Sequence, residues 1–221
     1  MQNKKVLLIL INGEGQTINL QRLFSTRLIL VIIGKCNMKS RLDVYDNVLE
    51  DHIAELIFLE MKEVYWKYDY NSQKGEVNKH WHVFCGETEE ETVENGYDWL
   101  VQLWQTIFYK YDFKNTYNIE RPKRIYMNAH THGVEPHEHT DDGDFTMIYY
   151  PRLDWKKDWG GGTLVDGELV PYVGNRLIVF NAKAPHQAMP VSRQCYELRS
   201  VVVFKTYVEG ANIERLDFYK D

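Results

Sequence analysis

The stretch Ala129–Tyr150 reads AHTHGVEPHEHTDDGDFTMIYY and holds four of the chain's eight histidines among several acidic residues. Its polar part leads directly into FTMIYY (145–150), an apolar and aromatic run that is typical of a β-strand. In the polar part, His137, His139 and Asp141 occupy alternate positions, so on an extended chain their side chains project to one side. The stretch therefore predicts a β-rich domain with a candidate metal site beside one of its strands.

A metal site here needs a further ligand from elsewhere in the chain. His186, in APHQAMP, follows the apolar run RLIVF (176–180) and is the distant candidate. Two imidazoles and one carboxylate form the facial triad that binds Fe(II) and leaves coordination positions open, which favours His139, Asp141 and His186. The pattern is weak by itself, and a cupin-like set of His137, His139 and His186 is the competing interpretation.

The strand that precedes the metal motif has one polar face. In residues 125–130, Tyr126, Asn128 and His130 alternate with apolar residues, and we expect this polar face to border the pocket. A lone histidine is more often a hydrogen-bonding residue than a ligand, so His130 and His132 are expected to be supporting or surface residues.

Helical periodicity precedes the β-type runs. Apolar positions recur every three or four residues in 47–64 and 88–111, and Glu50 and Glu91 complete capping boxes at the two starts. Helices followed by many short strands indicate an α+β fold, with helices packed against a β-sandwich or jelly roll. The expected strands are 125–130, 145–150, 162–165, 176–180 and 198–208.

Composition narrows the classes of function. A formal net charge of −6 and a pI of about 5.8 argue against general nucleic-acid binding. Three cysteines, Cys36, Cys85 and Cys195, have no zinc-ribbon spacing and predict a reducing, cytoplasmic setting. The apolar runs 6–11 and 28–33 are far shorter than the roughly 20 residues of a membrane-spanning helix, so no membrane anchor is expected.

We expect two parts along the chain. Residues 1–37 are an N-terminal extension, either extra strands or an upstream segment, and residues 38–221 form the functional domain. Within that domain, the helical part spans about 45–115 and the jelly-roll core about 122–208.

Three further segments follow the metal motif in a characteristic order. They read IYYPRLDWKKDWGGGTLV (148–165), GNRLIVFNAKAPHQAMPV (174–191) and LRSVVVFK (198–205). Together with HTD (139–141), they resemble the prolyl-4-hydroxylase-like branch of the Fe(II)/2-oxoglutarate-dependent oxygenases, including its small bacterial and phage members. The resemblance covers residues 124–205, less than half of the chain. It implies a double-stranded β-helix (jelly roll) with N-terminal helices packed against the sheet.

The resemblance also implies the roles of individual residues. His139, Asp141 and His186 match the iron ligands, and Arg199 matches the cation for the C5 carboxylate of 2-oxoglutarate. The chemistry agrees, because arginine offers a permanently charged, bidentate fork to a carboxylate. Tyr150 matches the position whose hydroxyl reaches the same carboxylate. The implied cofactors are Fe(II), 2-oxoglutarate and O2, with ascorbate as a further candidate.

Other residues are expected around the pocket, namely Tyr126, Asn128, His137 and Trp155. Trp155 either rims the pocket or packs beneath the glycine-rich turn of 160–162. Pro151 stands where many relatives continue the strand, and we expect it to end the strand at Tyr150.

The implied activity is hydroxylation of a C–H bond, in a prolyl or another protein side chain rather than in a small molecule, with release of succinate and CO2. Nucleic-acid demethylation would need a second cation beyond Arg199, and Lys205 is the only such residue on that strand. Two other classes stay open, because a fold does not determine a function. One is a cupin-like metal enzyme without 2-oxoglutarate, which would depend on His137 and not on Asp141, and the other is a catalytically silent jelly-roll binding module.

Overall fold

The computed structural model describes residues 41–71 and 78–210, and the predicted N-terminal extension at 1–37 lies outside them. The helices are α1 (Asp51–Glu63), α2 (Glu89–Glu94), α3 (Asp98–Lys110), α4 (Phe113–Tyr117) and the 3-10 helix η1 (Lys157–Trp159). The strands are β1 (Leu42–Tyr45), β2 (Lys67–Tyr70), β3 (His80–Gly86), β4 (Ile119–His130), β5 (Phe145–Tyr150), β6 (Thr163–Val165), β7 (Glu168–Val170), β8 (Arg176–Asn181), β9 (His186–Ala188) and β10 (Arg199–Val208). No helix in these two ranges combines the length and the apolar character that crossing a membrane requires.

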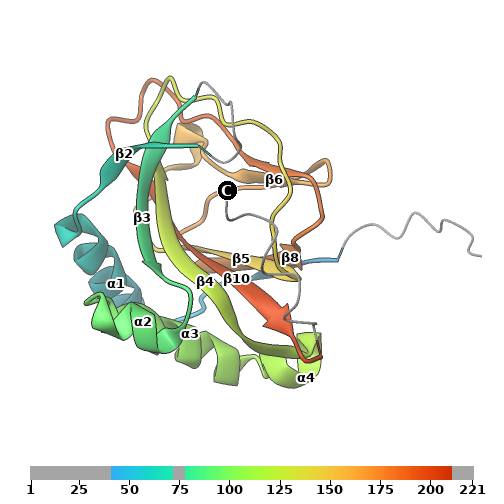
Figure 1. The fold of residues 1–221 in the computed structure, drawn as a ribbon. Coiled ribbons are helices and arrows are strands. Elements are labelled where there is room, and N and C mark those ends of the chain that lie inside the picture. Colours follow the sequence, from blue (N-terminus) through green and yellow to red (C-terminus); the bar gives the residue numbers. More distant parts are fainter. Residues whose placement is uncertain (1–40, 72–77, 211–221) are drawn as a thin grey trace, which may run out of the picture. The chain divides into compact units, whose positions relative to one another are not determined.

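The strands form two antiparallel sheets. The large sheet has the order β1-β8-β5-β10-β4-β3-β2, and the small sheet has the order β7-β6-β9. Helices α1 to α4 lie against one side of the large sheet, whereas β6 lies on its other side (Figure 1). The predicted α+β jelly roll with helices packed against the sheet is therefore confirmed.

Strand alternation divides the interior into two apolar clusters. On β5, Met147 and Tyr149 pack with the helices, whereas Ile148 and Tyr150 face the small sheet. Strands β4 and β10 alternate in the same way, because successive side chains of a strand point to opposite faces. The face toward the small sheet also carries polar residues, and the candidate functional site lies on this face.

Most of the expected strands are present. Strand β5 has the predicted bounds and ends before Pro151, and β6, β8 and β10 match their predicted positions to within one residue. Strand β3 was missed, although HWHVFCG places His80, His82 and Phe84 at alternate positions. Side chains on β3 therefore extend the polar face of β4 by one strand.

The predicted start of the first helix is wrong. Asn47 has φ 53°, and α1 begins only at Asp51, with no side-chain cap from Glu50. The preceding segment is held by Asn175 instead, whose Oδ1 accepts from the Leu49 N–H at 2.9 Å and whose Nδ2 donates to the Leu49 carbonyl at 2.7 Å. These bonds keep the segment out of the helix.

The second predicted helix is correct at its start and wrong in its length. Thr88 caps α2 as expected, because its Oγ1 accepts from the Glu91 N–H at 3.1 Å. The helix then ends after Glu94 and a new one begins at Asp98. Gly96 has φ 86° between them, a conformation that glycine adopts without the steric cost of a side chain and that ends a helix.

Candidate metal centre

The structure brings His139, Asp141 and His186 together from two segments. The segment between β4 and β5 carries His139 and Asp141, and His186 opens β9. Paired backbone hydrogen bonds of 2.9 Å join His139 to His186 in both directions, and the Asp141 N–H donates to the Ala182 carbonyl at 2.8 Å. The metal motif is thus not on a regular strand, but its backbone is held beside β8 and β9.

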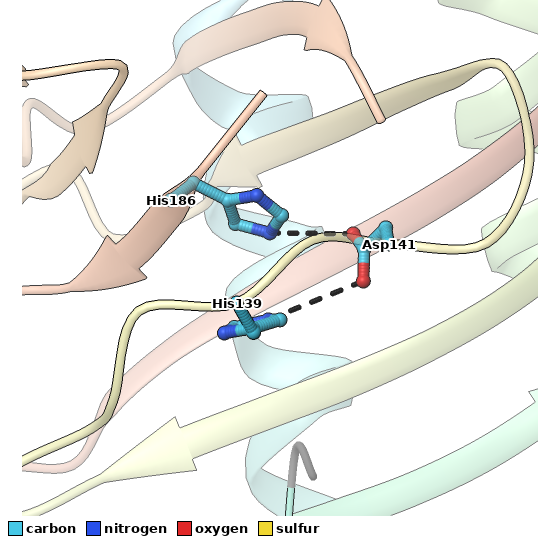
Figure 2. A group of neighbouring side chains, drawn as sticks. All are labelled: His139, Asp141 and His186. Atoms are coloured by element: carbon cyan, nitrogen blue, oxygen red, sulfur yellow. Dashed lines mark ion pairs between the residues drawn. The ribbon is translucent and has the colours of Figure 1, made fainter. Parts of the chain in front are cut away.

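The three side chains converge on one point (Figure 2). His186 Nε2 lies 3.3 Å from Asp141 Oδ2, and His139 Nε2 lies 4.0 Å from Asp141 Oδ1. One donor atom from each residue falls within 4.8 Å of the other two. Because metal–ligand bonds to nitrogen and oxygen are about 2 Å long, this spacing suits one shared ion.

Both imidazoles present Nε2 to the centre. His139 Nδ1 donates to the His137 carbonyl at 3.0 Å, and His186 Nδ1 donates to the Ala184 carbonyl at 2.9 Å. A carbonyl only accepts, so Nδ1 carries the proton and Nε2 keeps its lone pair for a metal. Burial, followed by the neighbouring His186, lowers the pKa of His139 and favours this neutral form.

Two donors hold the Asp141 carboxylate. Thr146 Oγ1 donates to Oδ2 at 2.7 Å, and Lys205 Nζ lies 2.9 Å from Oδ1. Burial by itself would raise the pKa of the Asp141 carboxyl, but the close contact with His186 and the charge of Lys205 hold this pKa well below its usual range. Asp141 is therefore ionised and oriented as a candidate metal ligand.

Arg199 lies in the same cavity as the triad and is 2% exposed. Its Nε donates to the Gly161 carbonyl at 2.6 Å, and its Nη2 lies 3.2 Å from Thr163 Oγ1. In the part of the chain that the structure describes, no carboxylate forms an ion pair with this guanidinium. A buried charge is costly unless it is paired, so the cavity offers a site for an anionic ligand.

His130 is a second unpaired group in this cavity. It is 5% exposed, and neither ring nitrogen has a hydrogen-bond partner within the described ranges. It stands opposite Arg199 in the β4–β10 pairing. Burial, and then the charge of Arg199, lower the pKa of His130 well below its usual value, so it is a neutral donor and acceptor. Buried polar atoms are usually hydrogen-bonded, and a polar ligand bound in the cavity would provide partners for the two ring nitrogens of His130.

Of the other predicted site residues, two line the cavity directly and Tyr150 lies behind its lining. Tyr126 and Asn128 line the cavity with the triad. Tyr150 contacts it indirectly, because its hydroxyl lies 2.6 Å from Thr163 Oγ1. Thr163 was not predicted as a site residue, although its place directly after the glycine turn of 160–162 could have indicated it.

His132, His137 and Trp155 do not line the cavity that holds the triad. His137 and His132 are exposed. Trp155 is buried, donates to the Gly160 carbonyl at 2.9 Å and stacks on Tyr172 with ring centroids 4.4 Å apart. It packs beneath the glycine turn and is absent from the cavity lining.

Comparison with known proteins shows the fold. No protein-family model matches the sequence, and no curated protein matches it. A prolyl-4-hydroxylase from Pseudomonas putida is similar in structure, with a TM-score of 0.54 and 15% identity over 76% of this chain and 94% of that chain. A 2OG-Fe(II) oxygenase family oxidoreductase from Burkholderia pseudomallei gives a TM-score of 0.57 and 12% identity over 75% of this chain and 84% of that one.

A third similar structure contains a peptide. It is a prolyl hydroxylase in complex with a hypoxia inducible factor peptide fragment from Trichoplax adhaerens, with a TM-score of 0.52 and 16% identity over 76% of this chain and 84% of that chain. The chain therefore has the fold of the prolyl hydroxylases and related 2OG-Fe(II) oxygenases, and the resemblance found in the sequence is confirmed for the fold.

Proposed function

We propose that this protein is an Fe(II)- and 2-oxoglutarate-dependent dioxygenase that hydroxylates a C–H bond in a prolyl or another protein side chain. The observation that carries the proposal is the buried Arg199, which has no ion-pair partner in the described residues and shares a cavity with His139, Asp141 and His186. A metal triad alone fits several chemistries. A triad with a built site for a ligand carboxylate fits a cosubstrate that has a carboxylate at each end.

The donor set fits a ferrous ion. Two neutral imidazoles and one ionised carboxylate are ligands that non-haem iron accepts, and three ligands leave coordination positions open. Bound iron supplies the redox chemistry, in which O2 and 2-oxoglutarate are consumed, substrate C–H becomes C–OH, and succinate and CO2 leave. The protein itself would hold and orient the iron and 2-oxoglutarate and would exclude water from the site.

Arg199 is the proposed partner of the distal carboxylate of 2-oxoglutarate. Its guanidinium is held in place by the Gly161 carbonyl and Thr163 Oγ1, so little freedom is lost when a carboxylate binds. Tyr150 supports this arrangement through Thr163. His130 offers one neutral N–H to an oxygen of the same ligand.

A protein side chain is the proposed substrate because a hydrogen bond between His82 and Asn128 links an aromatic groove to the site. The groove lies at the β2–β3 edge, has a volume of about 560 Å³ and includes Tyr70, His82 and Phe84 in its lining. His82 stacks on Tyr70 with ring centroids 3.8 Å apart, and its Nδ1 lies 2.7 Å from the Oδ1 of Asn128. Asn128 in turn lines the metal cavity. The peptide bound by the Trichoplax enzyme is consistent with this class of substrate.

Anaerobic titration with Fe(II) and 2-oxoglutarate tests the proposal. We expect a weak visible charge-transfer band in the wild-type protein and a much higher 2-oxoglutarate requirement in Arg199→Ala. Metal binding without such a band would contradict the oxygenase assignment and favour a cupin-like enzyme. Once the band is observed, proline-containing peptides incubated with O2 should gain the mass of one oxygen atom, and succinate should form in equal amount.

A further inference from the structure

Lys205 is a buried lysine in direct contact with the proposed metal carboxylate. It lies on β10, is 8% exposed, and its Nζ is 2.9 Å from Asp141 Oδ1 and 2.7 Å from Asp142 Oδ1. The sequence raised Lys205 only as a second cation for nucleic-acid chemistry. In the structure, the two carboxylates neutralise the charge of Lys205 inside the protein, so this lysine is part of an internal ion-pair cluster.

The two carboxylates depend on Lys205 to different degrees. Asp142 has additional cations, with Lys123 Nζ at 2.6 Å and Arg124 Nη2 at 3.4 Å. The Asp141 carboxylate has no other lysine or arginine within ion-pair distance in the described part of the chain, because Lys183 Nζ donates to the backbone carbonyl of Asp141, at 2.9 Å, and not to its side chain. Its remaining partners are neutral or titratable, namely Thr146 and the two histidines of the triad. Within the described residues, Lys205 is therefore the only lysine or arginine paired with the Asp141 carboxylate.

The same contact acts differently in the presence of a metal. Without an ion, a buried carboxylate needs a positive partner, and loss of such a partner is strongly destabilising. With a divalent ion on Asp141, the ammonium and the metal carry like charges on one carboxylate, and they repel at short range in a poorly solvated site. Lys205 should thus stabilise the metal-free protein and oppose the metal.

We infer that Lys205 is a positioning residue that holds Asp141 in place while the metal is absent and thereby lowers the affinity of the site for divalent metal. This inference rests on the metal site of the proposed function but not on 2-oxoglutarate or on a substrate. Its consequence is a site that is already formed before the ion arrives, with an affinity set below the maximum that its ligands allow.

Cobalt(II) binding and thermal unfolding test this inference in the full chain at pH 7.5. We expect Lys205→Met to lower the melting temperature of the metal-free protein and to bind Co(II) about tenfold more tightly than wild type. Saturating Co(II) should then raise the melting temperature of this variant by more than it raises that of wild type. A purely structural role for Lys205 would lower stability without tightening metal binding.

Lys123→Met is the matched control, because it also removes a lysine from Asp142 but leaves Asp141 untouched. The Co(II) affinity of this variant should stay within about threefold of wild type, because Lys123 pairs with Asp142 and not with the carboxylate proposed to bind the metal. Lys205→Gln keeps a hydrogen-bond donor and removes only the charge, so it serves where Lys205→Met does not fold, and it should also bind Co(II) more tightly.

Two failures are distinguishable. If wild type does not bind Co(II), the proposed metal site is wrong. If wild type binds Co(II) but the folded Lys205 variants bind it equally or more weakly, the metal site stands and the role inferred for Lys205 is overturned.

Discussion

Arg199 lies directly opposite His130 in the β4–β10 pairing, and both buried side chains enter the cavity that holds the metal triad. One is a cation without a carboxylate partner, and the other is a neutral imidazole whose nitrogens have no partner in the described residues. Their juxtaposition is suited to an anionic ligand with several acceptor oxygens.

His130→Phe should weaken 2-oxoglutarate binding by about 10- to 100-fold, the effect of losing one hydrogen bond to a charged ligand. Phenylalanine keeps the ring and removes the two unpaired nitrogens, so the ligand-free protein should unfold at the same or a higher temperature. Co(II) affinity should not change, since His130 is not in the triad. Titration of the Co(II)-loaded variant with 2-oxoglutarate measures the effect, and an unchanged dissociation constant would contradict it.

Arg199→Met should separate ligand binding from stability. Replacing a buried charge that lacks a counter-charge with an apolar side chain should leave the free energy of unfolding of the ligand-free protein unchanged or raise it by about 1–2 kcal/mol. In the presence of Mn(II), 2-oxoglutarate should stabilise wild type and no longer stabilise the variant. Urea unfolding with and without both ligands measures this. A large loss of stability in the ligand-free variant would point to a structural role for Arg199.

Asp141→Ala and His137→Ala distinguish the facial triad from the cupin-like set. Asp141 contributes an oxygen to the triad, whereas His137 is exposed and contributes its carbonyl to His139. Removal of Asp141 should weaken Co(II) binding by about 100-fold or more, and removal of the His137 side chain should change it by less than about threefold. The reverse ranking would support the cupin-like interpretation.

Stability should fall as the pH is lowered through the range in which unfolded histidines take up protons. The pKa of His130 in the folded protein is well below the usual histidine value of about 6.5 because of burial and the nearby Arg199. Below pH 6.5 the unfolded chain therefore binds a proton that the folded chain does not, and the free energy of unfolding decreases by up to about 1.4 kcal/mol per pH unit for this group. Above pH 6.5 the contribution is fully present.

Urea unfolding at several pH values between 5 and 8 measures this slope. His130→Phe should show a shallower decline than wild type, because the group that gains the proton only on unfolding has been removed. Identical slopes for the two proteins would show that His130 does not account for the loss.

The sequence was informative where short-range pattern carries the information. The apolar and aromatic run FTMIYY predicted β5 with its bounds, Pro151 predicted where that strand ends, and Thr88 with Glu91 predicted the start of α2. Each of these depends on neighbours a few residues apart. The capping box at Asn47 failed because Asn175, distant in sequence, binds the same segment.

The amino-acid sequence by itself therefore determined the fold class, the segments that form most strands, and a list of chemically suitable metal ligands. Only the tertiary structure decided which of those ligands meet and that Lys205 contacts Asp141. It also decided that, within the described residues, the buried Arg199 has no ion-pair partner and the ring nitrogens of the buried His130 have no hydrogen-bond partner. The physical reason is that these relationships depend on the register between strands and on what surrounds each charge. Strand register and burial are set by the packing of distant segments, which local periodicity does not contain.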